Sequence, residues 1–198
     1  MSVEKQEKKI FGLTKKQRSN AYTVLFIIVF LIFFFVNNSF DDSKPGPYPP
    51  NYQAKHDPSS RQTAPQFVLE SPQGGVVKLS DYEGKIVILD FWATWCAPCR
   101  KAIPDLIELR TEYPEDKFEI IGISLDTDTR DMVASFVEQQ NINYPIVYGD
   151  MNIAQEYGGI QSIPTSFVLD KQGRIYSSYV GYMQKEVYKT DIDKLLEE

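Results

Sequence analysis

The fold of this chain is decided by the segment Lys85-Ile86-Val87-Ile88-Leu89-Asp90-Phe91-Trp92-Ala93-Thr94-Trp95-Cys96-Ala97-Pro98-Cys99. Residues 85–92 form a nearly continuous apolar run, which is typical of a strand covered on both faces in a sheet with parallel pairs. A helix is expected to begin near Cys96, because Ile103, Leu106 and Ile107 then repeat on one helical face. Both cysteines of the chain therefore lie where a buried strand passes into a helix.

The spacing Cys96-Ala97-Pro98-Cys99 indicates redox chemistry. Free backbone N–H groups and the dipole at a helix N-terminus stabilise an anion, so the pKa of Cys96 is expected to be lowered and its thiol partly ionised near neutral pH. Cys99, one turn further in, is less exposed but close enough to form a disulfide with Cys96. This arrangement separates an attacking sulfur from a resolving sulfur in thiol-disulfide exchange.

Two other interpretations of the cysteine pair remain open: half of a metal site, or two small residues that fill a core. The chain has no second cysteine pair and a single histidine, so a zinc site built from Cys and His lacks its four ligands. Trp95 and Pro98 are unusual neighbours for cysteines that only fill a core. We therefore favour a redox-active pair, with no metal site and no cofactor other than the Cys96–Cys99 disulfide.

Short apolar runs alternate with amphipathic segments from residue 63 to the end of the chain. The glycine pair at 74–75 predicts a β-hairpin at the start of this region. This order of segments predicts an α/β fold, with helices on both faces of a sheet. Strands are expected at 67–69, 76–79, 85–92, 118–125, 144–148, 166–170 and 174–180, and helices at 96–113, after a cap at Thr127 or Asp128, at 152–157 and near the C-terminus.

Charge is distributed unevenly over the 198 residues. Residues 1–20 carry a local charge of +4, which leaves −10 for the remaining 178 residues. Such an acidic domain is a poor candidate for nucleic-acid binding, because it repels the phosphate backbone. The length accommodates one full-sized domain and a short appendage.

The N-terminus has the pattern of a membrane anchor. A basic segment, residues 1–20, precedes an almost wholly apolar run from residue 21 to 36. The positive-inside rule places residues 1–20 in the cytoplasm, a single transmembrane helix at 21–40 and the catalytic domain on the extracytoplasmic, periplasmic side. The run is a little shorter than the roughly 20 residues that a bilayer needs, so a cleaved signal peptide and a buried core helix are alternatives. Residues 37–42 contain no small-x-small cleavage site, which favours an uncleaved anchor.

Residues 41–62 are expected to form a tether between the anchor and a domain at 63–198. Five prolines lie among polar residues in this segment, a composition that cannot bury enough apolar surface to offset its ordering entropy. It is therefore predicted to be semi-extended. His56 lies in it and is expected to be solvated.

Several motifs of the chain occur together in a known family. Residues 90–101 resemble the active-site segment of thioredoxins, and Pro104 matches the proline in the helix that follows. Ser162-Ile163-Pro164-Thr165 resembles the family's loop in which a cis-proline faces the dithiol. The segment 64–85 and the extra αβ unit at 127–148 resemble those of the TlpA/ResA-like membrane-anchored thioredoxins. The resemblance covers residues 63–198, and it implies a thioredoxin-like fold with a central mixed sheet and protein thiol-disulfide oxidoreduction.

The resemblance also implies roles for residues around the dithiol. Asp90 corresponds to a buried aspartate that exchanges a proton with the second cysteine through water, and burial should raise its pKa toward the working pH. The alternatives for Asp90 are a solvated strand-end carboxylate and a helix cap. Ile163, which precedes Pro164, offers backbone groups that can pair with a substrate chain as an added strand. The alternative for Pro164 is an ordinary trans proline in a turn.

Three further residues, Trp95, Ala97 and Pro98, complete the expected active-site surface. Of the two tryptophans, Trp95 is a better candidate than Trp92 for contact with substrate. Ala102 differs from the subgroup, which usually has a glutamate three residues after the second cysteine. Position 102 therefore lacks the acid that serves specialised reduction in the subgroup, for example of apocytochrome c cysteines, and Asp90 is the alternative proton-handling group.

The residues between the cysteines bear on the direction of electron transfer. Strong oxidants of the family tend to place a histidine there, whereas Ala97-Pro98 offer the Cys96 thiolate neither charge nor a hydrogen bond, which predicts a reducing potential. A reductase outside the cytoplasm needs an electron donor, for which we expect a membrane thiol carrier. Its substrates are expected to be protein thiols and disulfides, including those of exported proteins whose cysteines await haem.

Two alternatives come from other functional classes. The first is a carrier that delivers Cu(I), but Met132, Met151 and Met183 are scattered along the chain. The second is a peroxiredoxin-like antioxidant, which is similar over residues 79–92, but two cysteines so close together at a helix start argue against it.

Overall fold

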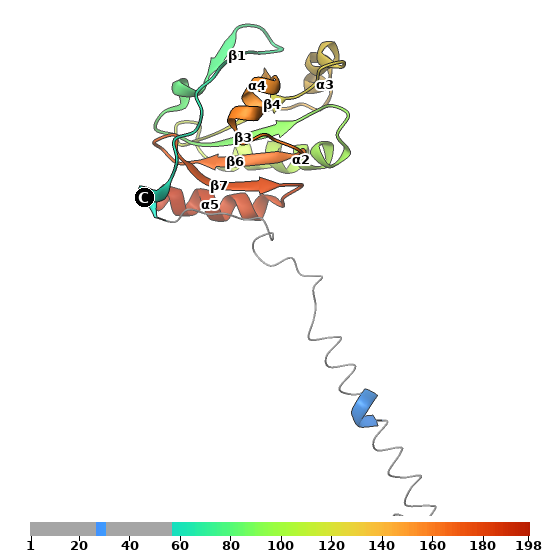
Figure 1. Cartoon of the computed structure of the whole chain (residues 1–198), viewed down its shortest axis with the longest axis vertical. Helices are drawn as coiled ribbons and strands as arrows, with labels where there is room; N and C mark the ends of the chain where they lie inside the picture. The colour runs from blue at the N-terminus through green and yellow to red at the C-terminus, as the bar shows by residue number, and fades with distance from the viewer. Residues whose placement is uncertain (1–26, 31–56) are drawn as a thin grey trace, which may run out of the picture. The chain divides into compact units, whose positions relative to one another are not determined.

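The computed structural model of the chain describes residues 27–30 and 57–198 (Figure 1). Residues 27–30 are helical and their side chains are exposed. No helix within the described residues is long and apolar enough to cross a membrane. The basic segment 1–20, His56, most of the anchor expected at 21–40 and most of the tether expected at 41–62 lie outside the described residues.

The centre of the domain is a five-stranded mixed sheet with the order β5-β4-β3-β6-β7. Its middle strand, β3, pairs parallel with β4 and antiparallel with β6. The outer strand β5 pairs parallel with β4, and β7 pairs antiparallel with β6. These strands are β3 (Ile86–Trp92), β4 (Phe118–Ser124), β5 (Ile146–Tyr148), β6 (Thr165–Leu169) and β7 (Ile175–Val180).

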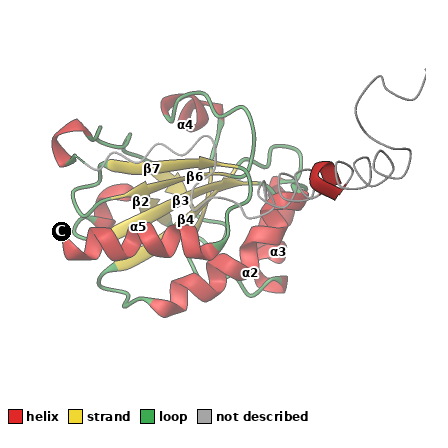
Figure 2. Cartoon of the chain, turned by 90° about the horizontal axis from the view of Figure 1, so that it is seen from below, coloured by secondary structure: helices red, strands yellow, loops and turns green. Residues whose placement is uncertain are grey.

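Helices cover both faces of this sheet, as Figure 2 shows for α2 and α5 on one side and α4 on the other. The helices are α2 (Ala97–Glu112), α3 (Val133–Gln139), α4 (Met151–Glu156) and α5 (Lys185–Glu197). A separate hairpin of β1 (Val68–Glu70) and β2 (Val76–Lys78) packs on the α4 side. Short 3₁₀ turns occur at η3 (Pro58–Ser60), η4 (Leu79–Tyr82) and η5 (Arg130–Met132). The expected α/β architecture with a mixed sheet and an N-terminal hairpin is therefore confirmed.

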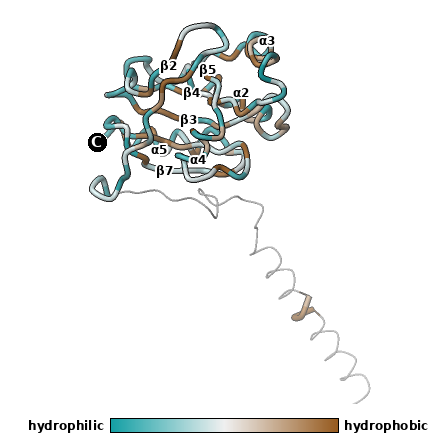
Figure 3. The backbone as a smooth tube through the Cα atoms, turned by 45° about the horizontal axis from the view of Figure 1, so that its top comes forward, coloured by the Kyte–Doolittle hydropathy of each residue, from teal (hydrophilic) through white to brown (hydrophobic). Residues whose placement is uncertain are grey.

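The two faces of β3 belong to two different hydrophobic cores. Ile86 and Ile88 point to the side of α2, α3 and α5, whereas Val87 and Leu89 point to the side of α4 and the hairpin, because successive side chains of a strand alternate. All residues of β3 and β4 are buried. Much of the hydrophobic colour in Figure 3 accordingly lies on the strands. Covering on both faces explains why these strands read as continuous apolar runs in the sequence.

The helix that follows β4 begins later than the sequence predicts. A cap at Thr127 or Asp128 was expected, but a 3₁₀ turn comes first and α3 begins at Val133. Thr129 donates its hydroxyl hydrogen to the carboxylate of Asp126, which lies at the end of the preceding strand. The segment after β4 is thus held against the strand end before the helix can start. The prediction of a cap at Thr127 or Asp128 is wrong.

The strand expected at 144–148 is also shorter, because β5 begins only at Ile146. Pro145 lacks a backbone N–H to donate to the sheet, although its carbonyl oxygen accepts from the N–H of Gly122 at 2.9 Å. From the proline onward, the first residue that has both an N–H and a carbonyl group to pair with β4 is therefore Ile146.

The folded domain extends a few residues beyond the boundary expected at residue 63. The N–H of Ile175 donates to the carbonyl oxygen of Gln62 at 2.8 Å. The side chain of Arg61 is buried and pairs with Asp170 at 3.0 Å and with Glu198 at 2.6 Å. The end of the expected tether is thus attached to a turn and to the C-terminus. The boundary at residue 63 was predicted from composition, which gives no information on these contacts.

Replacing Arg61 by alanine is expected to lower the free energy of unfolding by about 3 kcal/mol, because it leaves the buried carboxylate of Asp170 with one partner fewer. Urea unfolding measures the change. Arg130→Ala is the matched control, since the ion pair of Arg130 with Glu70 is exposed, and such pairs contribute about 1 kcal/mol or less. Equal losses in the two variants would contradict the interpretation of Arg61 as a buried anchor.

Candidate functional site

The two cysteines lie at the N-terminus of α2, directly after the loop that leaves β3. Cys96 is the N-cap of the helix, and its Sγ accepts a hydrogen bond from the backbone N–H of Cys99 at 3.2 Å. The two residues form a disulfide, with their Cα atoms 5.2 Å apart. The helix start expected near Cys96 is therefore confirmed. The same N–H group is in place to stabilise a thiolate at Cys96 when the disulfide is reduced.

The sulfurs are less exposed than the residues beside them. Cys96 is 5 % exposed and Cys99 is 1 % exposed, and both pack in the core on the α2 side of the sheet. Trp95, in contrast, is 62 % exposed, and Ala97 and Pro98 are also exposed. A partner that approaches Cys96 therefore meets these three residues first.

The loop at residues 162–165 lies against the dithiol. The Ile163–Pro164 peptide bond is cis, so Pro164 is not an ordinary trans turn proline. The carbonyl oxygen of Ile163 lies 3.6 Å from Sγ of Cys96. This contact follows from the sheet, in which the end of β3 pairs with the start of β6 through Phe91 and Thr165. Residues 67 positions apart in the sequence thus meet at one edge of the sheet.

Asp90 is buried on the same side of the sheet as the dithiol. Strand alternation places its side chain on the face of Ile88 and Trp92, and the residue is 4 % exposed. Burial raises the pKa of its carboxyl to about 7. Burial and then the negative charge of Asp90 also raise the pKa values of Tyr144 and Tyr188. Asp90 is therefore not a solvated carboxylate, and its pKa suits a group that takes and returns a proton near neutral pH.

Asp126 is a site residue that the sequence analysis missed. It is 2 % exposed, and its carboxylate accepts from the backbone N–H of Thr94 at 3.0 Å and from the Thr94 hydroxyl at 2.6 Å. The hydroxyl groups of Ser124, at 2.8 Å, and of Thr129 also donate to it. Asp126 thus attaches the loop before Cys96 to the end of β4. The available signal was an acidic residue directly after an apolar strand, at the edge where the active-site loop also leaves its strand.

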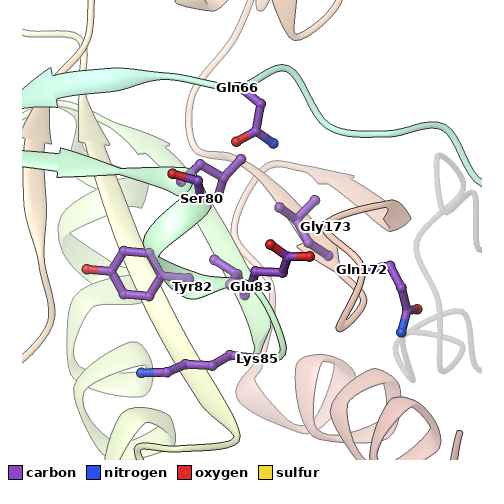
Figure 4. A pocket seen from close by; sticks show the side chains of 10 residues that line it. Gln66, Ser80, Tyr82, Glu83, Lys85, Gln172 and Gly173 are labelled. Carbon is purple, nitrogen blue, oxygen red and sulfur yellow. The ribbon is translucent and has the colours of Figure 1, made fainter.

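A hollow lies at the amino end of β3, around Lys85 and away from the cysteines (Figure 4). Its volume is about 200 Å³, and the ammonium group of Lys85 lies 5.5 Å from the centre of the Tyr82 ring. The cysteines follow the carboxyl end of β3, whereas Lys85 precedes its amino end. This hollow is therefore not part of the dithiol site.

The geometry at α2 predicts that Cys96 of the reduced protein reacts with iodoacetamide at a lower pH than an ordinary thiol. The midpoint of its alkylation rate is expected at least about one pH unit below the value of about 8.5 for free cysteine, because the N–H of Cys99 and the helix N-terminus stabilise the thiolate. Mass spectrometry of the alkylated peptides measures each cysteine separately, and Cys99 serves as the internal control. Equal, slow alkylation of both thiols would contradict the prediction.

The raised pKa of Asp90 predicts a pH-dependent cost to stability. As the pH rises from about 4 to about 7, the carboxyl ionises in the unfolded chain but stays protonated in the folded one, so the free energy of unfolding falls. Asp90→Asn removes this loss. At pH 8 its free energy of unfolding is expected to exceed that of the wild type by on the order of 4 kcal/mol, since each pKa unit corresponds to about 1.4 kcal/mol. Urea unfolding of the oxidised proteins at pH 4 to 8 checks this. Asp116→Asn, at an exposed carboxylate, controls for the lost charge, and a difference that does not vary with pH would refute the prediction.

Comparison with known proteins agrees with this site. The model of the AhpC/TSA family matches residues 61–178. The thiol-disulfide oxidoreductase ResA of Bacillus thuringiensis is 36 % identical over 133 residues, which cover 67 % of this chain and 76 % of the relative. The thioredoxin-like protein YneN of Bacillus subtilis is 34 % identical over 134 residues, covering 67 % and 78 %.

A solved structure with the same fold is also similar to this chain. A thiol:disulfide interchange protein, DsbE, from Chlorobium tepidum is 31 % identical and superposes with a TM-score of 0.60, covering 69 % of this chain and 95 % of that one. The expected thioredoxin-like fold is thereby confirmed. The chain belongs to the AhpC/TSA family and, within it, to the ResA- and YneN-like thiol-disulfide oxidoreductases.

Proposed function

We propose that this thiol-disulfide oxidoreductase is tethered to a membrane and reduces cysteines of exported proteins on the extracytoplasmic side. The chemistry is carried by one observation, the Cys96–Cys99 disulfide at the N-terminus of α2. The Ile163 carbonyl oxygen, 3.6 Å from Sγ of Cys96, adds a backbone group beside the reacting sulfur. A substrate chain that pairs with this backbone as an added strand brings its own sulfur to Cys96.

The first step is attack by the Cys96 thiolate on a substrate disulfide. A new bond forms between Sγ of Cys96 and one substrate sulfur, the substrate S–S bond breaks, and the second substrate sulfur leaves as a thiolate. Cys96 performs this step because it is the more exposed of the two cysteines and occupies the N-cap.

The second step releases the substrate. Cys99 gives its proton to Asp90, whose pKa of about 7 allows it to accept one near neutral pH. The Cys99 thiolate then attacks Sγ of Cys96, the mixed disulfide breaks, and the substrate leaves with both sulfurs reduced. The enzyme is left with the Cys96–Cys99 disulfide and needs two electrons, which a membrane thiol carrier supplies by the reverse exchange.

The reducing direction rests on the residues around Cys96. Ala97 and Pro98 bring no charged side chain to the thiolate, so the reduced form is stabilised mainly by the helix N-terminus. Substrates include cysteines that await haem. With Ala102, which is buried, in place of the glutamate of the subgroup, we assign proton transfer in this reaction to Asp90.

Attachment to the membrane rests on the N-terminal sequence. The local charge of +4 over residues 1–20, followed by the apolar run from residue 21, supports an uncleaved anchor at 21–40 with its N-terminus in the cytoplasm. The proline-rich segment after it gives the domain reach from the bilayer surface.

Trapping of mixed disulfides tests this function. The full-length Cys99→Ser variant is expected to accumulate, in the membrane fraction of a bacterial host, dithiothreitol-sensitive complexes with exported proteins, because the resolving sulfur is missing. The Cys96→Ser, Cys99→Ser double variant is the control and should form none. The wild-type potential against glutathione should lie closer to the roughly −270 mV of thioredoxin than to the roughly −120 mV of the oxidant DsbA. An empty trap, complexes with cytoplasmic proteins alone, or Cys96-dependent peroxide consumption faster than disulfide exchange would refute the proposal.

A further inference from the structure

A hollow lies beside the dithiol, between the active-site segment and the inserted αβ unit. Its volume is about 290 Å³. Thr94, Trp95 and Arg100 line one wall, and Met132 and Phe136, from η5 and α3, line the other. We refer to it as the side hollow. Its volume is at the lower limit of the roughly 300–1,000 Å³ of small-molecule sites, and it suits one large side chain.

The side hollow is flanked by large apolar side chains that solvent reaches. Trp95 is 62 % exposed and Met132 is 54 % exposed. Phe136 is half-buried, and its ring lies 5.5 Å from the ring of the buried Trp92. Apolar side chains gathered around a hollow mark a binding surface, and a methionine adapts its shape to different partners.

The walls of the side hollow are held in a defined position. The buried carboxylate of Asp126 accepts hydrogen bonds from Thr94 in one wall and from Thr129, which also lines the hollow, in the other. A ligand therefore meets a site that is already assembled, which reduces the entropy lost on binding.

The position of the side hollow identifies its occupant. Trp95 directly precedes Cys96 and Arg100 directly follows Cys99, so the hollow shares Trp95 with the exposed surface around Cys96. A polypeptide joined to Cys96 as a mixed disulfide necessarily has the neighbours of its cysteine within reach of this surface. The occupant is accordingly a side chain of the substrate itself.

The positive charge of Arg100 indicates which residue lies beside the docked side chain. Arg100 is exposed at the rim and makes no ion pair with any residue among 57–198. A carboxylate beside the docked side chain finds a free guanidinium there. From these contacts we propose that the side hollow selects substrates whose reactive cysteine is flanked by a large apolar residue next to an acidic one. This proposal rests on the proposed function and names a substrate class for the same site.

Reduction of peptide disulfides tests the proposal. The substrates are symmetrical disulfides of nine-residue peptides with one central cysteine, so that either sulfur carries the same peptide. One set has Phe-Glu at the positions just before or just after the cysteine, a second set has Phe-Gln at the same positions, and the reference peptide has Ser-Ser. The reduced full-length protein in detergent is mixed with each peptide, and tryptophan fluorescence follows the second-order rate constant. The best Phe-Glu peptide is expected to react at least about tenfold faster than the reference, as an apolar contact in a pocket allows.

Variants locate this preference in the side hollow. Met132→Asp and, independently, Ser135→Trp, which fills the hollow, are expected to reduce the tenfold preference to less than about twofold. Arg100→Gln should remove the preference for the Phe-Glu peptide over the Phe-Gln peptide. It should keep the preference for both of these peptides over the Ser-Ser reference. Met151→Asp is the matched control, because Met151 is an exposed methionine on α4 away from the hollow, and it should keep the full preference. Circular dichroism verifies that each variant is folded.

The outcomes separate the two proposals. If the wild type reduces hydroxyethyl disulfide but treats all peptides alike, the side hollow does not select substrates and only this inference is overturned. Equal effects of Met132→Asp and Met151→Asp also overturn it. If the wild type reduces neither hydroxyethyl disulfide nor any peptide, the proposed function fails, and the inference fails with it.

Discussion

The arrangement of the site depends on the position of β3 in the middle of the mixed sheet. A strand in the middle of a sheet has a neighbour on each side, and here one neighbour is parallel and the other antiparallel. The carboxyl ends of β3 and β4 and the amino end of β6 therefore meet at one edge. Cys96 follows the first of these ends, Asp126 follows the second, and Pro164 precedes the third. The site is a consequence of strand order more than of any single loop.

Two buried carboxylates near this edge have opposite surroundings. Asp126 accepts hydrogen bonds from the hydroxyl groups of Ser124 and Thr129 and from both the backbone and the side chain of Thr94, so its oxygen atoms hold these groups in place. Asp90 lies on an apolar face, where burial raises its pKa to about 7. A carboxylate with several hydrogen-bond donors connects segments of the chain, whereas one buried on an apolar face is costly to ionise.

The inserted unit between β4 and β5 changes what the site presents to a partner. The dithiol, the cis-proline loop and Asp90 come from α2, from the segment before β6 and from β3. Met132 and Phe136 come from the insertion and place apolar surface beside the same sulfur. Asp126 connects this insertion to Thr94, two residues before Cys96, by hydrogen bonds. The dithiol and the apolar wall beside it therefore come from different segments that meet at a shared edge.

The sequence by itself determined the features that depend on neighbouring residues. The apolar run of β3, the helix start at Cys96 and the hairpin at Gly74-Gly75 follow from periodicity and turn chemistry, which are local properties. Asp90 became a candidate through the resemblance of residues 90–101 to thioredoxins. Only the tertiary structure decided that Asp126 reaches Thr94, that the start of the domain is held by Arg61, and that α3 begins at Val133. In each of these cases the partner lies far away in the sequence or competes with a local capping preference. Such contacts follow from strand register and packing, which depend on the whole domain and leave no periodic signal in one segment.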